Sequence, residues 1–178
     1  MKNSHVTGVE RTFDKNEIIV SKTDLKGRIT YVNRVFMTLA DYTEKDLLDQ
    51  PHSIIRHPEM PRCVFKLLWD TIEKDKKEIF AYVINRSANG DHYWVLAHVT
   101  PSFDEGGNIV GYHSNRRVPD RRVLNDTIVP LYKKLLDEEN SHKNAKEGMN
   151  SAYQMLVALL EEKGVGYDEL IFSLSNAA

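Results

Sequence analysis

The residues that decide the fold are Gln50-Pro51-His52-Ser53-Ile54-Ile55-Arg56-His57-Pro58-Glu59-Met60-Pro61, a short proline-bracketed turn that carries two imidazoles and a guanidinium. Further along, Asn85-Arg86-Ser87-Ala88-Asn89-Gly90-Asp91-His92-Tyr93-Trp94 has the Asn-Gly pair of a β-hairpin between two strand-like runs. We expect the two segments to place hydrogen-bond donors and aromatic rings on opposite walls of one small pocket. That arrangement is typical of a ligand-sensing domain rather than of an enzyme.

The composition is that of one ordinary domain with a helical extension. The chain has 178 residues, of which 41% are hydrophobic, which is enough for a core. Its net charge is −2 with acids and bases interspersed, which argues against nucleic-acid binding, because that function needs a clustered basic surface. The single cysteine, Cys63, excludes a disulfide framework and a cysteine-rich metal site, so we expect a reducing, cytoplasmic setting.

No membrane-directed segment is predicted. Residues 1–15 are polar, are expected to form a loose N-terminal cap and lack the apolar run of a signal peptide. No segment approaches the roughly 20 apolar residues that a membrane-spanning helix needs. We therefore expect any action at a membrane to go through a partner.

The pattern that follows predicts an α+β fold, in which a five-stranded antiparallel sheet carries short flanking helices. β-branched and alternating runs predict strands at 18–23, 29–32, 79–86, 92–101 and 109–116. Between the second and third strands we expect short helices, the last of them starting at Pro61. Asn33 and Thr43 are expected to cap the first two, and Leu47 and Leu48 to pack inward.

Residues 121–178 differ in kind and predict a C-terminal helical extension. Apolar residues recur at spacings of four and three in two runs, Leu124-Ile128-Leu131-Leu135 and Met149-Tyr153-Leu156-Leu160. We expect two helices that each hide one face, joined by the polar stretch 137–147 and followed by a short amphipathic tail. Pro130 should kink the first helix or mark its true start. Such helices must find a partner or fold back on the sheet.

Three blocks together resemble the PAS domain of bacterial aerotaxis receptors, the Aer family. They are residues 41–47, which resemble the GYT-x-x-E-L segment of PAS sensors, the R-H-P-E-M-P string at 56–61 and the N-G-D-H-Y-W string at 89–94. The resemblance covers roughly residues 16–135 and implies a PAS sensor domain at 16–120. Members of this family bind FAD non-covalently and report redox or respiratory state to the chemotaxis machinery.

The resemblance also implies a partner. Full-length receptors of this family add a membrane anchor, a HAMP segment and a kinase-control domain, and we expect none of these within the 178 residues. We therefore expect a free-standing energy-taxis sensor that signals through a separate membrane-bound chemotaxis transducer of the methyl-accepting type. A homodimer is the other expected association.

A flavin needs a flat apolar slot with a few donors and acceptors at its polar edge. Trp69, in phase with Phe65 and Ile72 on one predicted helix, is expected either to stack on the ring or to be an ordinary core residue. Arg56 and His57 are expected to contact the ligand's phosphate or carbonyl edge, unless they only stabilise the turn through backbone carbonyls.

Four further residues are candidates for cofactor binding. His52 has the same two options as Arg56, and Asn85 is either a partner of the flavin's carbonyl or amide edge or a strand-end turn residue. Asn33 is a candidate contact whose alternative is the helix cap. Tyr93 and Trp94 lie on alternate faces of one strand, so that only one of them can face the pocket. Of these two residues, Trp94 is the candidate for cofactor binding.

One departure from the family bears on the cofactor. Aerotaxis receptors usually carry a tryptophan followed by a small residue and a glycine where this chain has Ile79-Phe80-Ala81. The change alters one expected wall of the pocket. A different flavin, or a differently filled pocket, is therefore an alternative to FAD.

Two other functions compete with a flavin sensor. Seven histidines offer axial ligands for haem, His57 or His92 first, and this haem would be non-covalent because no C-x-x-C-H motif occurs. A ligand-free PAS module for protein interaction or dimerisation is the other. We expect no enzyme, because the chain has no G-x-S-x-G, no phosphate-binding glycine loop and no H-E-x-x-H.

Overall fold

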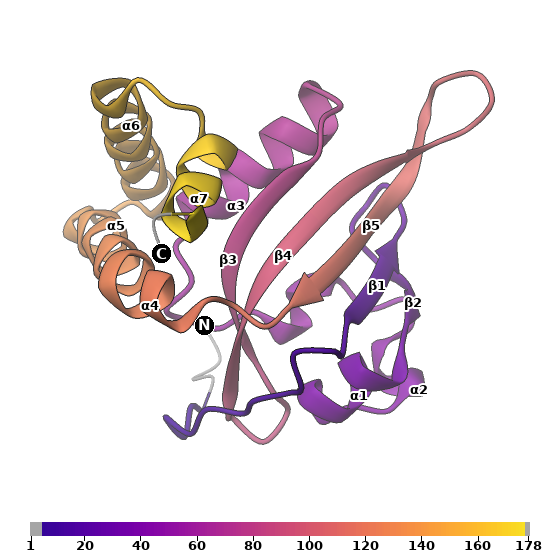
Figure 1. Cartoon of the computed structure of the whole chain (residues 1–178). Helices are drawn as coiled ribbons and strands as arrows, with labels where there is room; N and C mark the ends of the chain where they lie inside the picture. The colour runs from indigo at the N-terminus through magenta and orange to yellow at the C-terminus, as the bar shows by residue number, and fades with distance from the viewer. Residues whose placement is uncertain (1–4, 177–178) are drawn as a thin grey trace.

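One antiparallel sheet lies at the centre of the computed structural model, which describes residues 5–176. Its strand order is β2-β1-β5-β4-β3, so that β2 and β3 are the edge strands. The strands are β1 Ile19–Thr23, β2 Ile29–Val32, β3 Ile79–Arg86, β4 His92–Phe103 and β5 Ile109–Arg117. The predicted five-stranded antiparallel sheet is confirmed, and the β4–β5 hairpin projects well beyond the other strands (Figure 1).

Short helices connect β2 to β3, as predicted. They are α1 Arg34–Ala40, α2 Glu44–Leu47, the 3-10 helix η1 His52–Ile55, α3 Arg62–Trp69 and the π-helical turn η2 Asp70–Lys74. The side chain of Asn33 caps α1, and a capping box formed by Thr43 and Asp46 starts α2. Leu47 is fully buried, but Leu48 is 37% exposed, contrary to the prediction, because adjacent residues at a helix end point in different directions.

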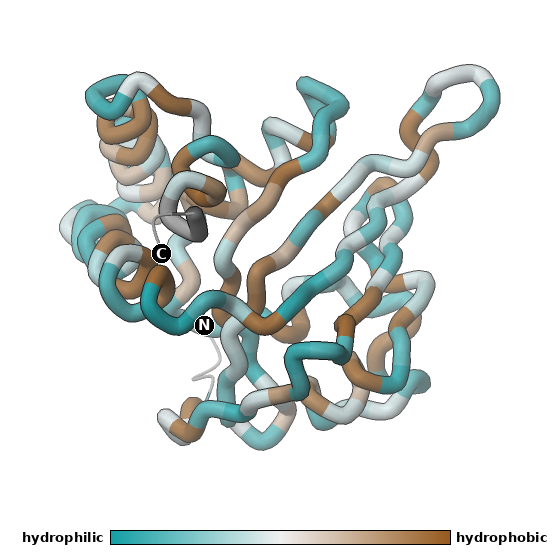
Figure 2. The backbone as a smooth tube through the Cα atoms, viewed as in Figure 1, coloured by the Kyte–Doolittle hydropathy of each residue, from teal (hydrophilic) through white to brown (hydrophobic). Residues whose placement is uncertain are grey.

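The C-terminal segment folds back on the same domain. It contains α4 Arg121–Val123, the π-helical turn η3 Leu124–Ile128, α5 Val129–Ser141, α6 Ala145–Lys163 and α7 Tyr167–Asn176. In Figure 1 these helices gather beside β3 and α3. Figure 2 shows hydrophobic and hydrophilic residues alternating along α5 and α6, as expected of amphipathic helices. The helices therefore hide their apolar faces by folding back on their own domain, which is one of the two arrangements expected from the sequence.

The connection between the two long helices is shorter than the polar composition of 137–147 predicts. Helix α5 continues to Ser141 and α6 starts at Ala145, so that residues 142–144 alone connect them. The side chain of Asn144 accepts hydrogen bonds from Lys146 N and Glu147 N and so caps α6. Pro130 lies in the first turn of α5, directly after the π-helical turn, and so marks the start of that helix.

The described part of the N-terminal cap, residues 5–15, is tied down rather than loose. Glu10 forms a parallel bridge with His92, and Thr7 N donates to Gly90 O at 2.9 Å. Arg11 forms an ion pair with Asp91 at 3.1 Å and also donates to backbone carbonyls of α1. Residues 1–4 of the expected cap lie outside the described part of the chain.

Candidate functional site

A cavity of about 350 Å³ lies between α3 and the sheet. Its size is within the range of roughly 300–1,000 Å³ that is usual for small-molecule sites. Along the sheet, the side chains that line it come from one face of alternating strand residues, Ser21, Val83, Asn85, Ala97, Val99, Ser114 and Arg116. The turn at 51–56 closes one end, so that the proline-bracketed segment does form a wall, as predicted.

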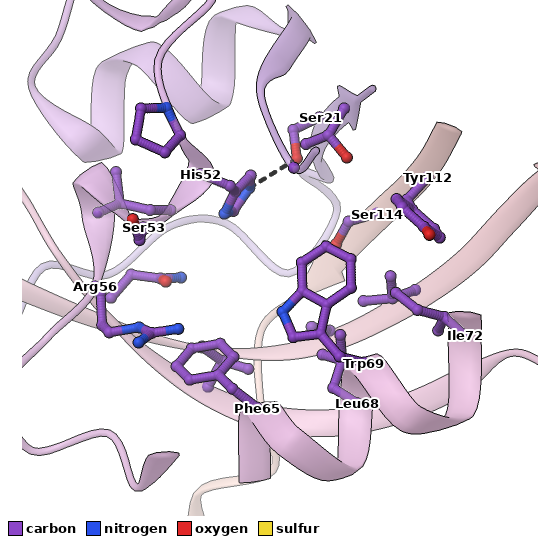
Figure 3. Close-up of a pocket in the computed structure, with 18 of the residues that line it drawn as sticks. Ser21, His52, Ser53, Arg56, Phe65, Leu68, Trp69, Ile72, Tyr112 and Ser114 are labelled. Carbon is purple, nitrogen blue, oxygen red and sulfur yellow. Dashed lines mark hydrogen bonds between the residues drawn. The ribbon is translucent and has the colours of Figure 1, made fainter. Parts of the chain in front are cut away.

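The wall formed by α3 and η2 is apolar and aromatic. Phe65, Leu68, Trp69 and Ile72 point from this helix into the cavity (Figure 3). The Trp69 ring meets Tyr112 edge-on, with ring centroids 5.3 Å apart and an interplanar angle of 86°. Trp69 therefore presents an apolar ring to the cavity, which fits a flat ligand.

A buried arginine dominates the polar side of the cavity. Arg116 is 4% exposed, and its Nη2 donates to Ser21 Oγ and to His52 Nε2, both at 2.7 Å. Its Nη1 is buried and has no hydrogen-bond partner among the described residues. Burial lowers the pKa of Arg116 to about 10, so the guanidinium stays charged at neutral pH.

Two more buried donors in the cavity lack partners. Asn85 Nδ2 and Ser114 Oγ have no hydrogen-bond partner among the described residues, and both residues line the cavity. Leaving such a group unpaired in a protein interior costs about 1–3 kcal/mol. Together with Arg116 Nη1 they form a set of donors that needs acceptor atoms from a ligand or from water.

His52 is held in its neutral form beside this set. Burial, and then the charge of Arg116, lowers the pKa of His52 to about 3. The neutral Nε2 can therefore accept the hydrogen bond from Arg116, and it lies 3.2 Å from Ser21 Oγ. Figure 3 shows His52 and Ser21 together on the side of the cavity opposite Leu68.

Arg56 lies at the mouth of the cavity. Its side chain is exposed, and its guanidinium carbon is 4.1 Å from the centroid of the Phe65 ring, a cation–π contact. Its backbone forms a bridge with Asn85 on the edge strand β3. Arg56 can thus reach a charged group of a ligand that projects from the mouth.

Three of the sequence candidates do not line the cavity. His57 is 4% exposed, but its Nδ1 accepts from Glu59 N at 3.2 Å and its ring faces that of His92. His57 therefore supports the turn, which was the alternative to ligand contact. Asn33 is occupied as the cap of α1 and also donates to Ile18 O at 2.7 Å.

Trp94 is the third candidate outside the cavity. It pairs with Ile84 across β3 and β4, and its ring centroid is 6.1 Å from that of Tyr132 on α5. Strand alternation places it on the face opposite the cavity. Its neighbour Tyr93 points to the cavity side but is fully buried in the core.

The residues that depart from the family, Ile79-Phe80-Ala81, are not part of the cavity wall. Ile79 and Ala81 are buried in the core, and Phe80 lies on the opposite face of the sheet, where its ring contacts His98 and Phe172. Ile79 and Ala81 pair directly with Val99 and Ala97, which do line the cavity, so their effect on its shape stays a prediction.

The sequence interpretation missed Arg116, Ser21 and Ser114. A signal was present, because Tyr112, Ser114 and Arg116 alternate on the last strand in phase with its buried face. An arginine at such a position needs a specific role, since charged residues are almost never fully buried without one.

The comparisons with known proteins agree with this architecture. Residues 29–116 match the family model described as the PAS fold. The chain has the PAS fold. It is 39% identical over 132 residues to the aerotaxis receptor of Escherichia coli strain K12, a match that covers 74% of this chain and 25% of that receptor. The chain thus spans about a quarter of that relative's length.

Solved structures show the same PAS fold. A PAS domain from Colwellia psychrerythraea superposes with a TM-score of 0.53 at 20% identity, covering 59% of this chain and 88% of that one. The dark structure of the blue-light photoreceptor Aureochrome1 LOV gives 0.52 at 25% identity, covering 68% and 84%. No helix within residues 5–176 has the length and apolar character to cross a membrane. That part of the chain also holds no cluster of three or more metal-ligating side chains.

Proposed function

We propose that the protein is a flavin-binding PAS sensor of redox or oxygen state, with FAD as the cofactor. One observation carries the proposal: three buried donors without partners among the described residues, Arg116 Nη1, Asn85 Nδ2 and Ser114 Oγ, belong to residues that line a cavity with an aromatic wall. A flavin ring is flat and apolar on its faces and has carbonyl oxygens and ring nitrogens along one edge. Such an edge would supply the acceptors that these donors lack.

The size and the mouth of the cavity suit this assignment. A volume of about 350 Å³ is near the lower end of the usual range, so the ring system would fill it. The remainder of FAD would leave through the mouth, where Arg56 and Lys26 lie. Their positive charges are suited to phosphate groups, and the guanidinium of Arg56 can bind one through two hydrogen bonds.

The cofactor would supply the redox chemistry. The protein residues would bind the cofactor and respond to its redox state. Trp69 and Phe65 exclude water from the ring face, and the buried donors orient the polar edge. A change in the hydrogen-bonding preferences of that edge would shift the balance between two conformations of the domain. The shift can be only as large as the difference in ligand affinity between them.

The similarity to the aerotaxis receptor supports the rest of the proposal. It covers 25% of that receptor, and we propose that a separate membrane-bound chemotaxis transducer supplies the output. Pull-down of purified sensor with a candidate transducer, with and without cofactor, tests this step. A transducer that binds neither form would contradict it.

A matched pair of tryptophan variants tests flavin binding. Trp69→Ala removes a cavity wall, whereas Trp94→Ala removes the same side chain from the opposite face of the sheet. We expect flavin absorbance per protein to fall about tenfold or more in Trp69→Ala and to stay near wild type in Trp94→Ala. Equal flavin content in both variants, or a Soret band in place of flavin absorbance, would refute the assignment.

A further inference from the structure

Helix α3 obtains its N-terminal cap from a distant part of the chain. The residue at its own N-cap position, Pro61, makes no side-chain hydrogen bond. Instead, Oε1 of Glu139 on α5 accepts from Cys63 N in the first turn of α3, at 2.8 Å. Both residues are buried, Glu139 with 7% exposure and Cys63 with none. A carboxylate at this end of a helix satisfies a free backbone donor and interacts favourably with the helix dipole.

The same helix forms the aromatic wall of the cavity. Phe65 and Trp69 point from α3 into the cavity (Figure 3), while Glu139 of α5 accepts a hydrogen bond from Cys63 N in the first turn of the same helix. One short helix therefore lies between the cavity and the helical arm, by which we mean α5 and α6. A displacement of α3 relative to α5 would change the distance between Cys63 N and Glu139 Oε1, which is 2.8 Å here.

Two further polar contacts between α3 and the arm are weaker. Lys66 Nζ lies 4.4 Å from the centroid of the Tyr153 ring, and Arg62 donates to Ala145 O at 3.5 Å. The hydrogen bond from Arg62 is exposed and long, so it contributes little to holding the arm against α3. The Glu139 bond is buried, short and charge-assisted, and it is therefore the contact most sensitive to the position of α3.

We propose that Glu139 is a positioning residue that couples docking of the helical arm to the helix that walls the cavity. The identity of the ligand rests on the proposed function, but the clamp between Glu139 and α3 does not. By linkage, a ligand that favours the docked arm is bound more tightly when the arm is docked, by the same factor. The fraction of molecules with a docked arm then depends on whether the cavity holds a ligand.

Cys63 is a built-in reporter of docking. It is the single cysteine of the chain, it is fully buried, and its backbone N–H is the donor to Glu139. The rate at which a thiol reagent labels it measures how often the arm opens. We expect Glu139→Ala to speed labelling of ligand-free protein about tenfold or more, because it removes a hydrogen bond to a charged group.

Two variants control this measurement. Glu139→Gln keeps an acceptor oxygen and the side-chain length, so we expect its labelling rate to stay near wild type. Asp137→Ala removes an exposed carboxylate from the same helix and should leave the rate unchanged. Urea unfolding of each variant supplies the global stability. An increase in Glu139→Ala that is fully accounted for by lost global stability would overturn the proposal, as would no increase.

Labelling with and without flavin separates this proposal from the proposed function. In wild type, flavin loading should change the Cys63 labelling rate, and in Glu139→Ala that change should disappear. Stoichiometric flavin with the same rate in loaded and ligand-free wild type overturns the coupling and leaves the flavin assignment standing. If wild type takes up no flavin, the flavin assignment fails, and the ligand-free rates of Glu139→Ala and Glu139→Gln alone decide whether the clamp exists.

Discussion

At the scale of single residues, Arg116 is the most consequential side chain of the cavity. Its guanidinium is buried with one nitrogen unpaired, and an unpaired buried charge is costly in the ligand-free protein. Such a cost is tolerated where a ligand removes it, which is why strained or unsatisfied groups concentrate at functional sites.

We predict that Arg116→Met will keep or raise the free energy of unfolding of the ligand-free domain while lowering flavin affinity about tenfold or more. Removal of the charge leaves Ser21 Oγ and His52 Nε2 3.2 Å apart, close enough to bond to each other. Urea denaturation and flavin titration measure the two effects. The neighbouring Arg117→Met, exposed and on the other face, is the matched control. Flavin affinity that is equal in the two variants would remove Arg116 from the site.

At the scale of elements, the C-terminal helices protect the free edge of β3. Phe80 N donates to Asp168 Oδ1 at 2.9 Å, and Tyr82 O accepts from Tyr132 OH at 2.6 Å. An uncovered edge strand would pair with other chains, so these side chains prevent association through β3. The arm and α7 thus stabilise the sheet as well as contacting α3.

The close packing of α5 on α6 depends on Gly148. A Cβ at this position would lie 2.1 Å from Glu139 O, which is backbone and cannot move alone. Gly148→Ala must therefore push the two helices apart and is predicted to cost about 1–3 kcal/mol of unfolding free energy. Gly166→Ala, where a Cβ would meet nothing within 4 Å, should change stability by less than about 0.5 kcal/mol. The urea midpoints of both variants test this, and equal midpoints would argue against tight packing at Gly148.

At the scale of the whole molecule, acid should destabilise the fold through His52 and His57. Burial lowers the pKa of His52 to about 3 and that of His57 to about 4, from an ordinary value near 6.5. Below that ordinary value the unfolded chain binds protons that the folded protein does not. The stability contributed by the neutral rings is therefore present above about pH 6.5 and is lost as the pH falls toward 4.

We predict a loss of up to about 1.4 kcal/mol per pH unit for each of these histidines between pH 6.5 and 4. Carboxylates such as Asp91, whose hydrogen bonds to Thr7, Asn89 and Arg11 lower its pKa to about 2, add a separate loss of stability below about pH 4. The informative quantity is thus the difference between wild type and His57→Gln in urea unfolding at pH 7 and pH 5. A pH dependence that is identical in the two proteins would show that His57 titrates normally.

Local sequence determined most of the elements, since their signals lie within a few residues of each other. The strand at 29–32, the cap at Asn33 and the capping box of Thr43 and Asp46 follow from side chains that act on adjacent backbone. Trp69, Asn85, Arg56 and His52 could likewise be chosen as cavity residues from helix and strand phase and from the family resemblance.

Only the tertiary structure decided how those elements serve the cavity. Arg116 meets His52 from 64 residues away, and Glu139 caps α3 from 76 residues away. Turn chemistry and periodicity are local and carry no information on which buried donor meets which acceptor across the core. Those pairings arise when the sheet, α3 and the arm pack around the cavity. Each buried polar group must then form a hydrogen bond within the protein or with a ligand.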